Sequence, residues 1–404
     1  MNHSINKLAL SITASILAAV GAQAYEVPLT YFGTNMPPID FHGFASQGFL
    51  YSGDYNYLAN DTRNGSFQFS EVGVNLSMNP FPNTRIAVQG FDFDVGNVGQ
   101  YDPFLDYALV EYTINDEVGI RAGRIRRPGG IYNSIQDIDV ARTYVLLPQG
   151  IYDARWRDWS AGLDGGELFG SIPLGKAGSL SYETYAGIVN MSDNGGVARY
   201  IESTGATLEN IDSSPAFGSQ LWYNTPLEGL RIGASFAYMA NLTYDVTVPV
   251  MPGLMVPMES VANAPLQQYS AEYVWKNWTF QAEYYTYDLT GYNYSPAFGN
   301  HPQPMENNPQ SWYAAVSHRF NKYFEVGTYY TQCRINSTIT KQFPSDDYQN
   351  DAALSFRFDP TDWWTFKIEG HYIEGTGLLR DSVNNPVRSD DGWFMLALKT
   401  TFSF

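Results

Sequence analysis

The sequence predicts an all-β protein: a transmembrane antiparallel β-barrel of about 16 strands, with short turns at one end and long loops at the other. Three observations predict this fold class: a strictly alternating carboxy-terminal segment, an excess of aromatic residues, and a regular succession of short and long polar connections. Aromatic residues make up 16% of the 404 residues. Transmembrane barrels need this excess, because aromatic girdles lie at both membrane interfaces.

The last residues of the chain alternate between an apolar and a polar face, as a half-buried strand does. One face carries Phe394, Leu396, Leu398, Thr400, Phe402 and Phe404, and the other carries Ala397, Lys399, Thr401 and Ser403. A tilted strand of about ten residues crosses a bilayer core. A final strand that ends on Phe404 resembles the signal by which the barrel-assembly machinery recognises Gram-negative outer-membrane barrels.

Residues 1–24 have the composition of a secretory signal peptide. Lys7 supplies a positive charge, an apolar stretch follows from Leu8 to Val20, and Ala22-Gln23-Ala24 forms a small-residue cleavage motif. This apolar stretch is too short for a membrane anchor, and no later stretch reaches the ~18 apolar residues of a spanning helix. We therefore expect residues 25–404 to form one exported barrel domain, located in the cell outer membrane.

Charge and cysteine content exclude several kinds of partner and cofactor. The full chain has a net charge of −18, which argues against nucleic acid as a partner and favours cations at the channel mouths. Cys333 is the only cysteine, so an intramolecular disulfide and a cysteine-based metal site are excluded. We expect no cofactor and no metal.

Short turns and long loops alternate along residues 25–404 without interruption. The short turns are Gly, Pro, Asn and Asp clusters typical of hairpins, at residues 79–83, 115–116, 173–178, 226–229, 276–277, 321–322 and 359–362. The long loops cover about residues 53–65, 95–103, 126–156, 191–213, 244–263, 290–309, 336–346 and 375–390. Seven turns and eight loops separate sixteen strands, beginning with a strand over about residues 40–51. A barrel of this size encloses a water-filled channel.

The alternation also assigns side chains to the two faces of the wall. In residues 278–285, Trp278 and Phe280 share the apolar face, while Gln281 and Glu283 share the other. A charge on the lipid face costs about 2–4 kcal/mol at the bilayer midplane, so charged residues should face the lumen. The inward cations are then Arg85, Arg121, Arg231, Arg319, Arg357, Lys367 and Lys399, and the inward acids are Glu71, Glu111, Glu183, Glu272, Glu283, Glu325 and Glu369.

The third long loop, about residues 126–156, is the longest and the richest in paired charges. Around it lie Arg124, Arg126, Arg127, Arg142, Arg155 and Arg157, together with Asp137, Asp139, Asp153 and Asp158. The order of strands, the terminal Phe404 and this long loop resemble the sixteen-stranded porins of Gram-negative bacteria. The segment from Gly123 to Asn133, which leads into this loop, resembles a stretch of phosphate-selective and related uncharacterised porins.

This resemblance implies a function. In that family the third loop folds into the barrel and narrows the pore, where acids face a ladder of wall arginines and make a transverse field. We therefore expect a pore constriction formed by Arg124, Arg126, Arg127, Asp137, Asp139, Arg142, Asp153 and Arg155. The implied activity is passive diffusion of small hydrophilic solutes and ions. A channel selective for anions such as phosphate is the alternative, because both signs of charge are present.

The loop from Val246 to Val261 is apolar and interrupted by prolines. Exposed apolar patches often mark a contact. The resemblance implies a homotrimer, so the loop could pack on a neighbouring subunit, or it could fold over the mouth of its own barrel. Both alternatives stay open at the level of sequence.

Other classes of outer-membrane barrel fit less well. Ser317 and His318 are adjacent on a strand and so point to opposite faces, and the chain has no HExxH or Gly-x-Ser-x-Gly motif, which argues against an enzyme. An adhesive or structural barrel would be smaller or carry a passenger domain. A plugged, energy-coupled transporter would need an amino-terminal domain that the residues after Tyr25 are too few to form.

Overall fold

The computed structural model describes residues 25–31, 34–203, 205–251, 253–299, 301–335, 344–379, 384–389 and 392–404. The predicted signal peptide, residues 1–24, lies outside the described residues. Among the described residues, no helix has the length and the apolar character needed to span a membrane.

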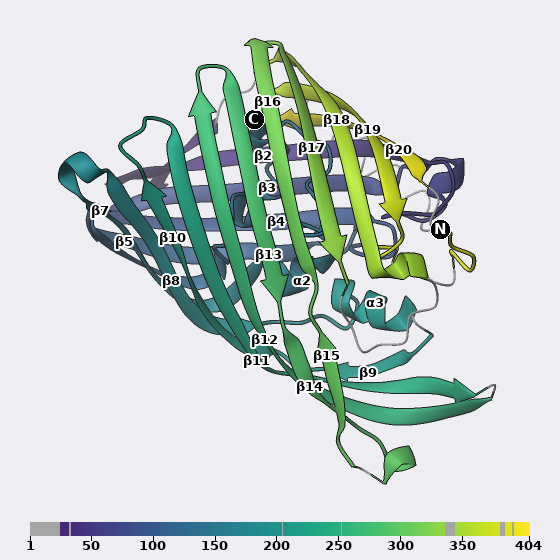
Figure 1. The fold of residues 1–404 in the computed structure, drawn as a ribbon. Helices are drawn as coiled ribbons and strands as arrows, with labels where there is room; N and C mark the ends of the chain where they lie inside the picture. The colour runs from purple at the N-terminus through teal and green to yellow at the C-terminus, as the bar shows by residue number, and fades with distance from the viewer. Residues whose placement is uncertain are drawn as a thin grey trace.

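Sixteen described strands close into one antiparallel barrel, which confirms the predicted fold class (Figure 1). They are β2 (Thr34–Ser52), β3 (Phe69–Phe81), β4 (Thr84–Val95), β5 (Phe104–Asn115), β6 (Val118–Arg126), β7 (Gly162–Pro173), β8 (Ser179–Val189), β10 (Ser214–Asn224), β11 (Leu230–Met251), β12 (Leu254–Trp275), β13 (Trp278–Tyr287), β16 (Gln310–Asn321), β17 (Phe324–Arg334), β18 (Tyr348–Thr361), β19 (Trp364–Gly375) and β20 (Trp393–Ser403).

The barrel closes where the first and last of these strands pair. Phe44 of β2 lies opposite Ser403 of β20, and Ser52 lies opposite Met395. At the terminus, the amide nitrogen of Phe404 donates to the carbonyl of Gly43 at 3.0 Å. This pairing satisfies the backbone groups of both edge strands, as the hydrocarbon core of a membrane requires. It also sets the register of the first strand, which the glycine-rich sequence leaves undefined.

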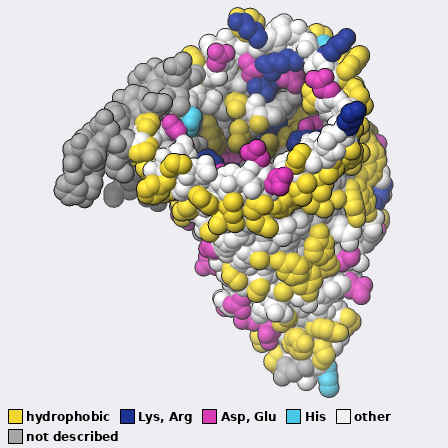
Figure 2. All heavy atoms as spheres, turned by 90° about the vertical axis from the view of Figure 1, so that its left-hand side faces the viewer, with side chains coloured by type: hydrophobic (Ala, Val, Ile, Leu, Met, Phe, Trp, Pro, Cys, Tyr) yellow, Lys and Arg dark blue, Asp and Glu magenta, His cyan; other side chains and the backbone are white. Residues whose placement is uncertain are grey.

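All seven predicted turns connect neighbouring strands at one end of the barrel, here called the turn end, and the long connections lie at the loop end. Viewed from the left-hand side of Figure 1, the turn end is hollow (Figure 2). Acidic and basic side chains lie in this hollow, and hydrophobic side chains form a band around the outside (Figure 2). Exposed apolar residues of this outer surface include Val110, Ile120, Leu168, Leu221, Ile232, Tyr269, Tyr284, Leu354 and Phe394.

The predicted loop at residues 244–263 is instead strand, and this part of the prediction is wrong. β11 and β12 continue past the barrel rim as one long hairpin, which β9 (Thr207–Ile211) and β14 (Leu289–Tyr294) extend on either side. A further strand, β15 (Gln303–Asn307), pairs with β14. Pro249 and Pro257 lie beyond the residues that these neighbours pair, so their missing N–H groups interrupt no ladder on that side.

This sheet, made of β9, β11, β12, β14 and β15, projects from the loop end (Figure 1). Its base packs on the loops, because Leu242 and Val197 share an apolar cluster with the half-buried Tyr244. Val197 belongs to the helix α3 (Gly196–Ser203). The outer part of the sheet leaves Met251 and Met255 exposed. Only the base of the sheet therefore packs against the loops of its own barrel.

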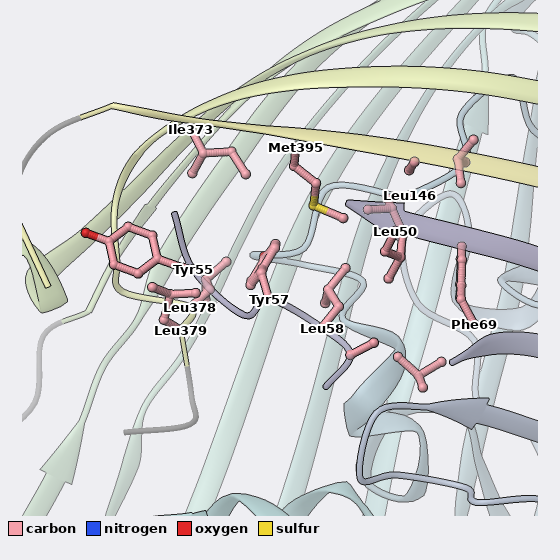
Figure 3. Close-up of a cluster of buried hydrophobic side chains, with 14 of the residues drawn as sticks. Leu50, Tyr55, Tyr57, Leu58, Phe69, Leu146, Ile373, Leu378, Leu379 and Met395 are labelled. Carbon is pink, nitrogen blue, oxygen red and sulfur yellow. The ribbon is translucent and has the colours of Figure 1, made fainter. Parts of the chain in front are cut away.

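Apolar side chains fill much of the loop end inside the barrel. Residues of β2, β3, β19 and β20 meet residues of the first, third and last loops there (Figure 3). Leu50, Tyr57 and Trp393 are almost fully buried in this cluster, and Leu146 of the third loop joins them. Apolar side chains therefore fill part of the lumen at the loop end, and the lumen is hollow at the turn end. The sequence predicts that the third loop narrows the pore, but it does not predict this apolar cluster.

Candidate pore constriction

The third loop, residues 127–161, enters the barrel and contacts the opposite inner wall at three places, and the wall beside its own stem at a fourth. It leaves β6 at Arg126, crosses to the wall made by β10 to β20, and returns through the short helix α2 (Arg157–Ser160) to β7. The loop is five residues longer than predicted at its end, because α2 belongs to it. Each of the three contacts brings a loop backbone or carboxylate group to a buried charged residue of the wall.

The first contact centres on Glu283 of β13. Its carboxylate accepts hydrogen bonds from the amide of Ile131 at 2.9 Å and from the hydroxyl groups of Tyr152 and Tyr313. Ser270 donates to it from β12. A buried carboxylate is stable only when its lone pairs are satisfied, and here the loop supplies two of the donors. Glu283 thereby holds the two ends of the loop, at Ile131 and Tyr152, against the wall.

The second contact uses Glu369 of β19 as an acceptor for consecutive loop amides. Val145 donates to its carboxylate at 2.9 Å and Leu146 at 2.8 Å. The ring of His371 stands between Glu369, at 3.1 Å, and Asp351, at 3.0 Å. Both ring nitrogens therefore face carboxylates, and the imidazole orients Glu369 toward the loop.

The third contact is an ion cluster around Asp139, which is fully buried. Its carboxylate lies 3.0 Å from the Nζ of Lys367 and 3.5 Å from the Nζ of Lys399, and it accepts from the hydroxyl of Thr401 at 2.8 Å. Burial opposes ionisation, but the two lysines outweigh it and hold the pKa of Asp139 below its ordinary value. Lys399 also pairs with Glu71 at 2.6 Å. The loop thus supplies the acid that two buried wall lysines need.

A second ion cluster joins the loop to the wall beside its own stem. Asp137 and Asp106 share the guanidinium of Arg126, and Arg157 pairs with Asp106 at 2.6 Å. Gln89 of β4 donates to Asp137 at 2.9 Å. Burial raises the pKa of Asp137, but Arg126 and Arg157 outweigh it, so the net pKa is below its ordinary value.

The sequence does not predict a role for Asp106, and a β-bulge explains why. Gln89 lies opposite Tyr107, whereas the next residue, Gly90, lies opposite Leu105. The extra residue is Asp106, which reverses the alternation along β5. Strict alternation back along the chain from the inward-facing Glu111 therefore assigns Asp106 to the lipid face. In the structure, Asp106 instead faces Arg126 and Arg157 inside the barrel. A bulge of this kind leaves no clear signal in the sequence.

The structure brings together most of the predicted constriction residues, in separate clusters. Arg126 and Asp137 lie in the Asp106 cluster, and Arg142 lies 3.6 Å from Asp139. Asp153 pairs with Arg155 at 2.6 Å, and the Nε of Arg127 donates to the carbonyl of Ser160 at 3.0 Å. Arg124 lies beside the Asp106 cluster, where its Nε donates to the backbone carbonyl of Asp106 at 3.3 Å, and it also pairs with Asp164 of β7 at 3.6 Å.

The predicted wall residues divide by depth. Glu71, Lys367 and Arg357 lie at the third loop, where Arg357 donates to the carbonyl of Arg142 at 3.2 Å. Others lie toward the turn end: Arg85 is exposed, and the remaining three form ion pairs with inward acids. Those three are Arg121 with Glu111, Arg231 with Glu272, and Arg319 with Glu325.

Open space lies at the loop end and again in the hollow at the turn end. A cavity of about 530 Å³ at the loop end is lined by Asp106, Arg157 and Asp158 together with residues of the fourth loop. Nearer the turn end, a cavity of about 310 Å³ is lined by Phe169, Glu183 and Trp222.

The closed sixteen-stranded barrel, its apolar outer band and its inward third loop together define the porin fold of outer-membrane barrels. No protein-family model matches the sequence, and no curated protein sequence matches it. Solved structures do match. OmpT of Vibrio cholerae, an outer membrane protein in its trimer form, has a TM-score of 0.58 at 12% identity, covering 91% of this chain and 99% of that one.

Two further structures show the same similarity of fold. An anion-selective porin from Comamonas acidovorans has a TM-score of 0.54 at 10% identity, with 91% of this chain and 99% of that chain covered. The outer membrane channel DcaP of Acinetobacter baumannii has a TM-score of 0.53 at 10% identity, with 91% and 98% covered. At such identities the similarity concerns the fold alone.

Proposed function

We propose that this chain is an outer-membrane porin, a water-filled channel for passive diffusion of small hydrophilic solutes and ions, with residues 127–161 as its constriction. The observation that carries the proposal is the course of the third loop, which crosses the lumen and is bonded to the wall at Glu283, Glu369 and the lysine pair. Because these wall contacts hold the loop in place, it can narrow the lumen even though it contains little regular secondary structure.

The constriction residues act through two ion clusters of mixed sign. Around Asp106, two arginines face two aspartates; around Asp139, two lysines and Arg142 face one aspartate. Fixed charges of both signs along a narrow path sort solutes by charge and orient water. Arg124 donates to the carbonyl of Asp106 beside the first cluster. The proposed constriction set is therefore the one that the sequence predicts: Arg124, Arg126, Arg127, Asp137, Asp139, Arg142, Asp153 and Arg155.

The test of this function is single-channel recording of the purified, folded protein in a planar bilayer. Stepwise conductance is the expected result. A barrel that is folded by circular dichroism and by its resistance to denaturation in cold detergent, yet gives no conductance steps, would contradict the proposal. In that case the packed loop end would close the lumen completely, and the chain would be an occluded barrel.

An outer-membrane enzyme is the competing function, and His371 is the residue on which it would depend. Its two ring nitrogens lie 3.0 Å and 3.1 Å from carboxylates, in the wall beneath the third loop. An acyl-transfer site would place a hydroxyl or thiol nucleophile at one of these nitrogens. The geometry favours a role for His371 in holding Glu369.

Three partners follow from the proposed function. Outer-membrane lipid contacts the apolar band, and the barrel-assembly machinery would recognise the strand that ends at Phe404. A homotrimer is the proposed assembly, supported by the trimer form of the Vibrio cholerae barrel of similar fold. The exposed apolar end of the β11–β12 hairpin is a candidate contact between subunits. Cross-linking of the protein in outer-membrane vesicles would test the trimer.

A further inference from the structure

A second cavity at the loop end has an apolar floor and a polar rim. Its floor includes Tyr57, Leu58 and Val98, which are 2%, 8% and 6% exposed. Its rim carries side chains of the first three loops and of α3. Binding sites for small molecules have this division, in which apolar surface supplies contact area and a few polar groups set the orientation of the ligand.

Two aromatic rings form one side of this cavity. Trp156, near the end of the third loop, and Tyr200 of α3 both line it, with their ring centroids 5.3 Å apart and their planes at 56°. Both side chains are half-buried, so part of each ring remains open to a ligand. A sugar ring has C–H groups on its faces and hydroxyl groups at its edge, and such an apolar face packs well on an aromatic ring.

Three asparagines of the first and second loops stand on the rim. The side-chain amide of Asn60 donates to the side-chain oxygen of Asn97. Within the described part of the chain, no hydrogen bond uses the side-chain oxygen of Asn60 or the side-chain amide of Asn97. This acceptor and this donor therefore lie side by side and match two neighbouring hydroxyl groups, since a hydroxyl both donates and accepts. The third asparagine, Asn56, accepts from the backbone amide of Arg63 at 3.1 Å.

The charges at this cavity are compensated before a ligand arrives. Its two arginines each pair with an acid, Arg155 with Asp153 at 2.6 Å and Arg199 with Glu202 at 2.7 Å. No acidic side chain is among the described residues that line it. A charged ligand of either sign therefore finds no uncompensated partner, whereas a neutral ligand with hydroxyl groups finds amides and guanidinium N–H groups.

The size of the cavity suits a single sugar ring. Its volume is about 70 Å³, and roughly 10–15 Å³ by the same measure holds one water, so it has room for about five waters. The cavity of about 530 Å³ described above adjoins it, because Val98, Arg155 and Gly196 line both. A second sugar unit has room to extend in that direction.

We propose that this loop-end cavity binds a neutral sugar at the mouth of the channel, with Trp156 and Tyr200 against the ring and Asn60 and Asn97 on its hydroxyl groups. The inference deepens the proposed channel function and rests on it. Because Trp156 belongs to the third loop, a bound sugar lies beside the constriction and should reduce the ion current through it.

The experiment is a calorimetric titration of the folded protein in detergent micelles with maltose, and with sorbitol, which has hydroxyl groups but no ring. We expect maltose to bind and sorbitol to give no heat of binding. Trp156→Ala should weaken maltose binding roughly tenfold through the lost aromatic contact. Asn97→Ala, at an exposed position, should fold normally and weaken it roughly fivefold through one lost hydrogen bond.

Phe298→Ala is the matched control, because Phe298 is an exposed aromatic residue of the projecting sheet outside both cavities, and it should bind maltose as the wild type does. In a planar bilayer, maltose should also lower the single-channel conductance of the wild type more than that of Asn97→Ala.

Three results would overturn the inference: no heat with maltose, equal binding of sorbitol, or unchanged maltose affinity in Asn97→Ala. The titrations require no ion current, so they are judged apart from the channel function. Absence of conductance steps in sugar-free solution would overturn the channel function instead.

Discussion

Asp139 is a carboxylate of the third loop that faces three basic side chains inside the barrel. Lys367, Lys399 and Arg142 lie 3.0, 3.5 and 3.6 Å from it, and both lysines are fully buried. The net charge of the group is reduced further by Glu71, which pairs with Lys399. Removing one member of a buried ion cluster leaves an uncompensated buried charge. The free-energy cost of that charge is larger than the net stabilisation that the ion pair provides.

The substitution Asp139→Asn should therefore lower the free energy of unfolding by about 3–5 kcal/mol. Denaturant unfolding in detergent micelles, followed by circular dichroism, measures this loss. Asp193→Asn provides the control, because Asp193 is an exposed loop acid and its loss should change stability by less than about 0.5 kcal/mol. Equal stability of the two variants would mean that the loop is held by its other contacts and that the lysine pair is satisfied without it.

At the scale of elements, α2 and α3 meet through Asp158. Its carboxylate faces the backbone amides of Gly196 and Val197 at the start of α3, and burial, which these amides only partly offset, raises its pKa to about 6. In the unfolded chain an aspartate titrates near pH 4, about two units lower. The folded contact therefore binds the proton more tightly, and the contact becomes more stable as the pH falls from above 6 toward 4.

We accordingly expect the amides of α3 to gain protection from hydrogen exchange between pH 7 and pH 5, after correction for the intrinsic pH dependence of exchange. Asp158→Asn, which keeps the shape of the side chain but does not titrate, should remove this gain. Amides of β20, far along the chain in the barrel wall, serve as the internal control. If protection of α3 were flat with pH, or fell toward pH 5, the assignment to Asp158 would be wrong.

The β11–β12 extension is an element that the barrel does not need for closure. The wall portion of the pair runs from Leu230 opposite Tyr273 to Met239 opposite Ala264, and a register shift separates it from the extension. Replacing residues 244–261 by a short Gly-Ser hairpin should leave barrel stability within about 1 kcal/mol of the native value, since β9 and β14 then lose only peripheral partners. Unfolding in micelles would measure this.

The same variant tests the proposed contact between subunits. If the exposed Met251 and Met255 lie in a trimer interface, the truncated protein should fold but give monomers on cross-linking. A trimer that persists would place the interface on the barrel wall instead, and the extension would have another role. A truncated chain that fails to fold would show that the extension helps to close the barrel.

For the whole molecule, alternation along the strands predicts the wall well and the interior poorly. The period of two places Lys367, Glu369 and Lys399 inward, and the structure confirms each of these positions. Alternation states which face a residue occupies, however, and not what fills the space beyond it. The buried clusters around Leu50 and Tyr313 arise when loops distant in sequence meet inside the barrel, and no local pattern encodes that meeting. Bulges add a second limit, as Asp106 shows.

Whether the third loop sets the size of the channel can be tested by shortening it where its two halves meet. The hydroxyl of Tyr152 accepts from the amide of Ile131 at 3.0 Å, so residues 133–150 can be replaced by a short Gly-Ser linker without moving either stem. Such a chain keeps the Glu283 contact. The cluster around Arg126 loses only Asp137. The constriction hypothesis predicts conductance steps clearly larger than those of the wild-type protein, and passage of larger neutral sugars in a liposome-swelling assay. A variant with replaced residues 296–299, in the exposed turn between β14 and β15 on the projecting sheet, is the control and should keep the wild-type conductance. If the shortened third loop left conductance and size limit unchanged in folded protein, the narrowest part of the lumen would lie elsewhere, and the packed first and last loops at the loop end would be the next place to look.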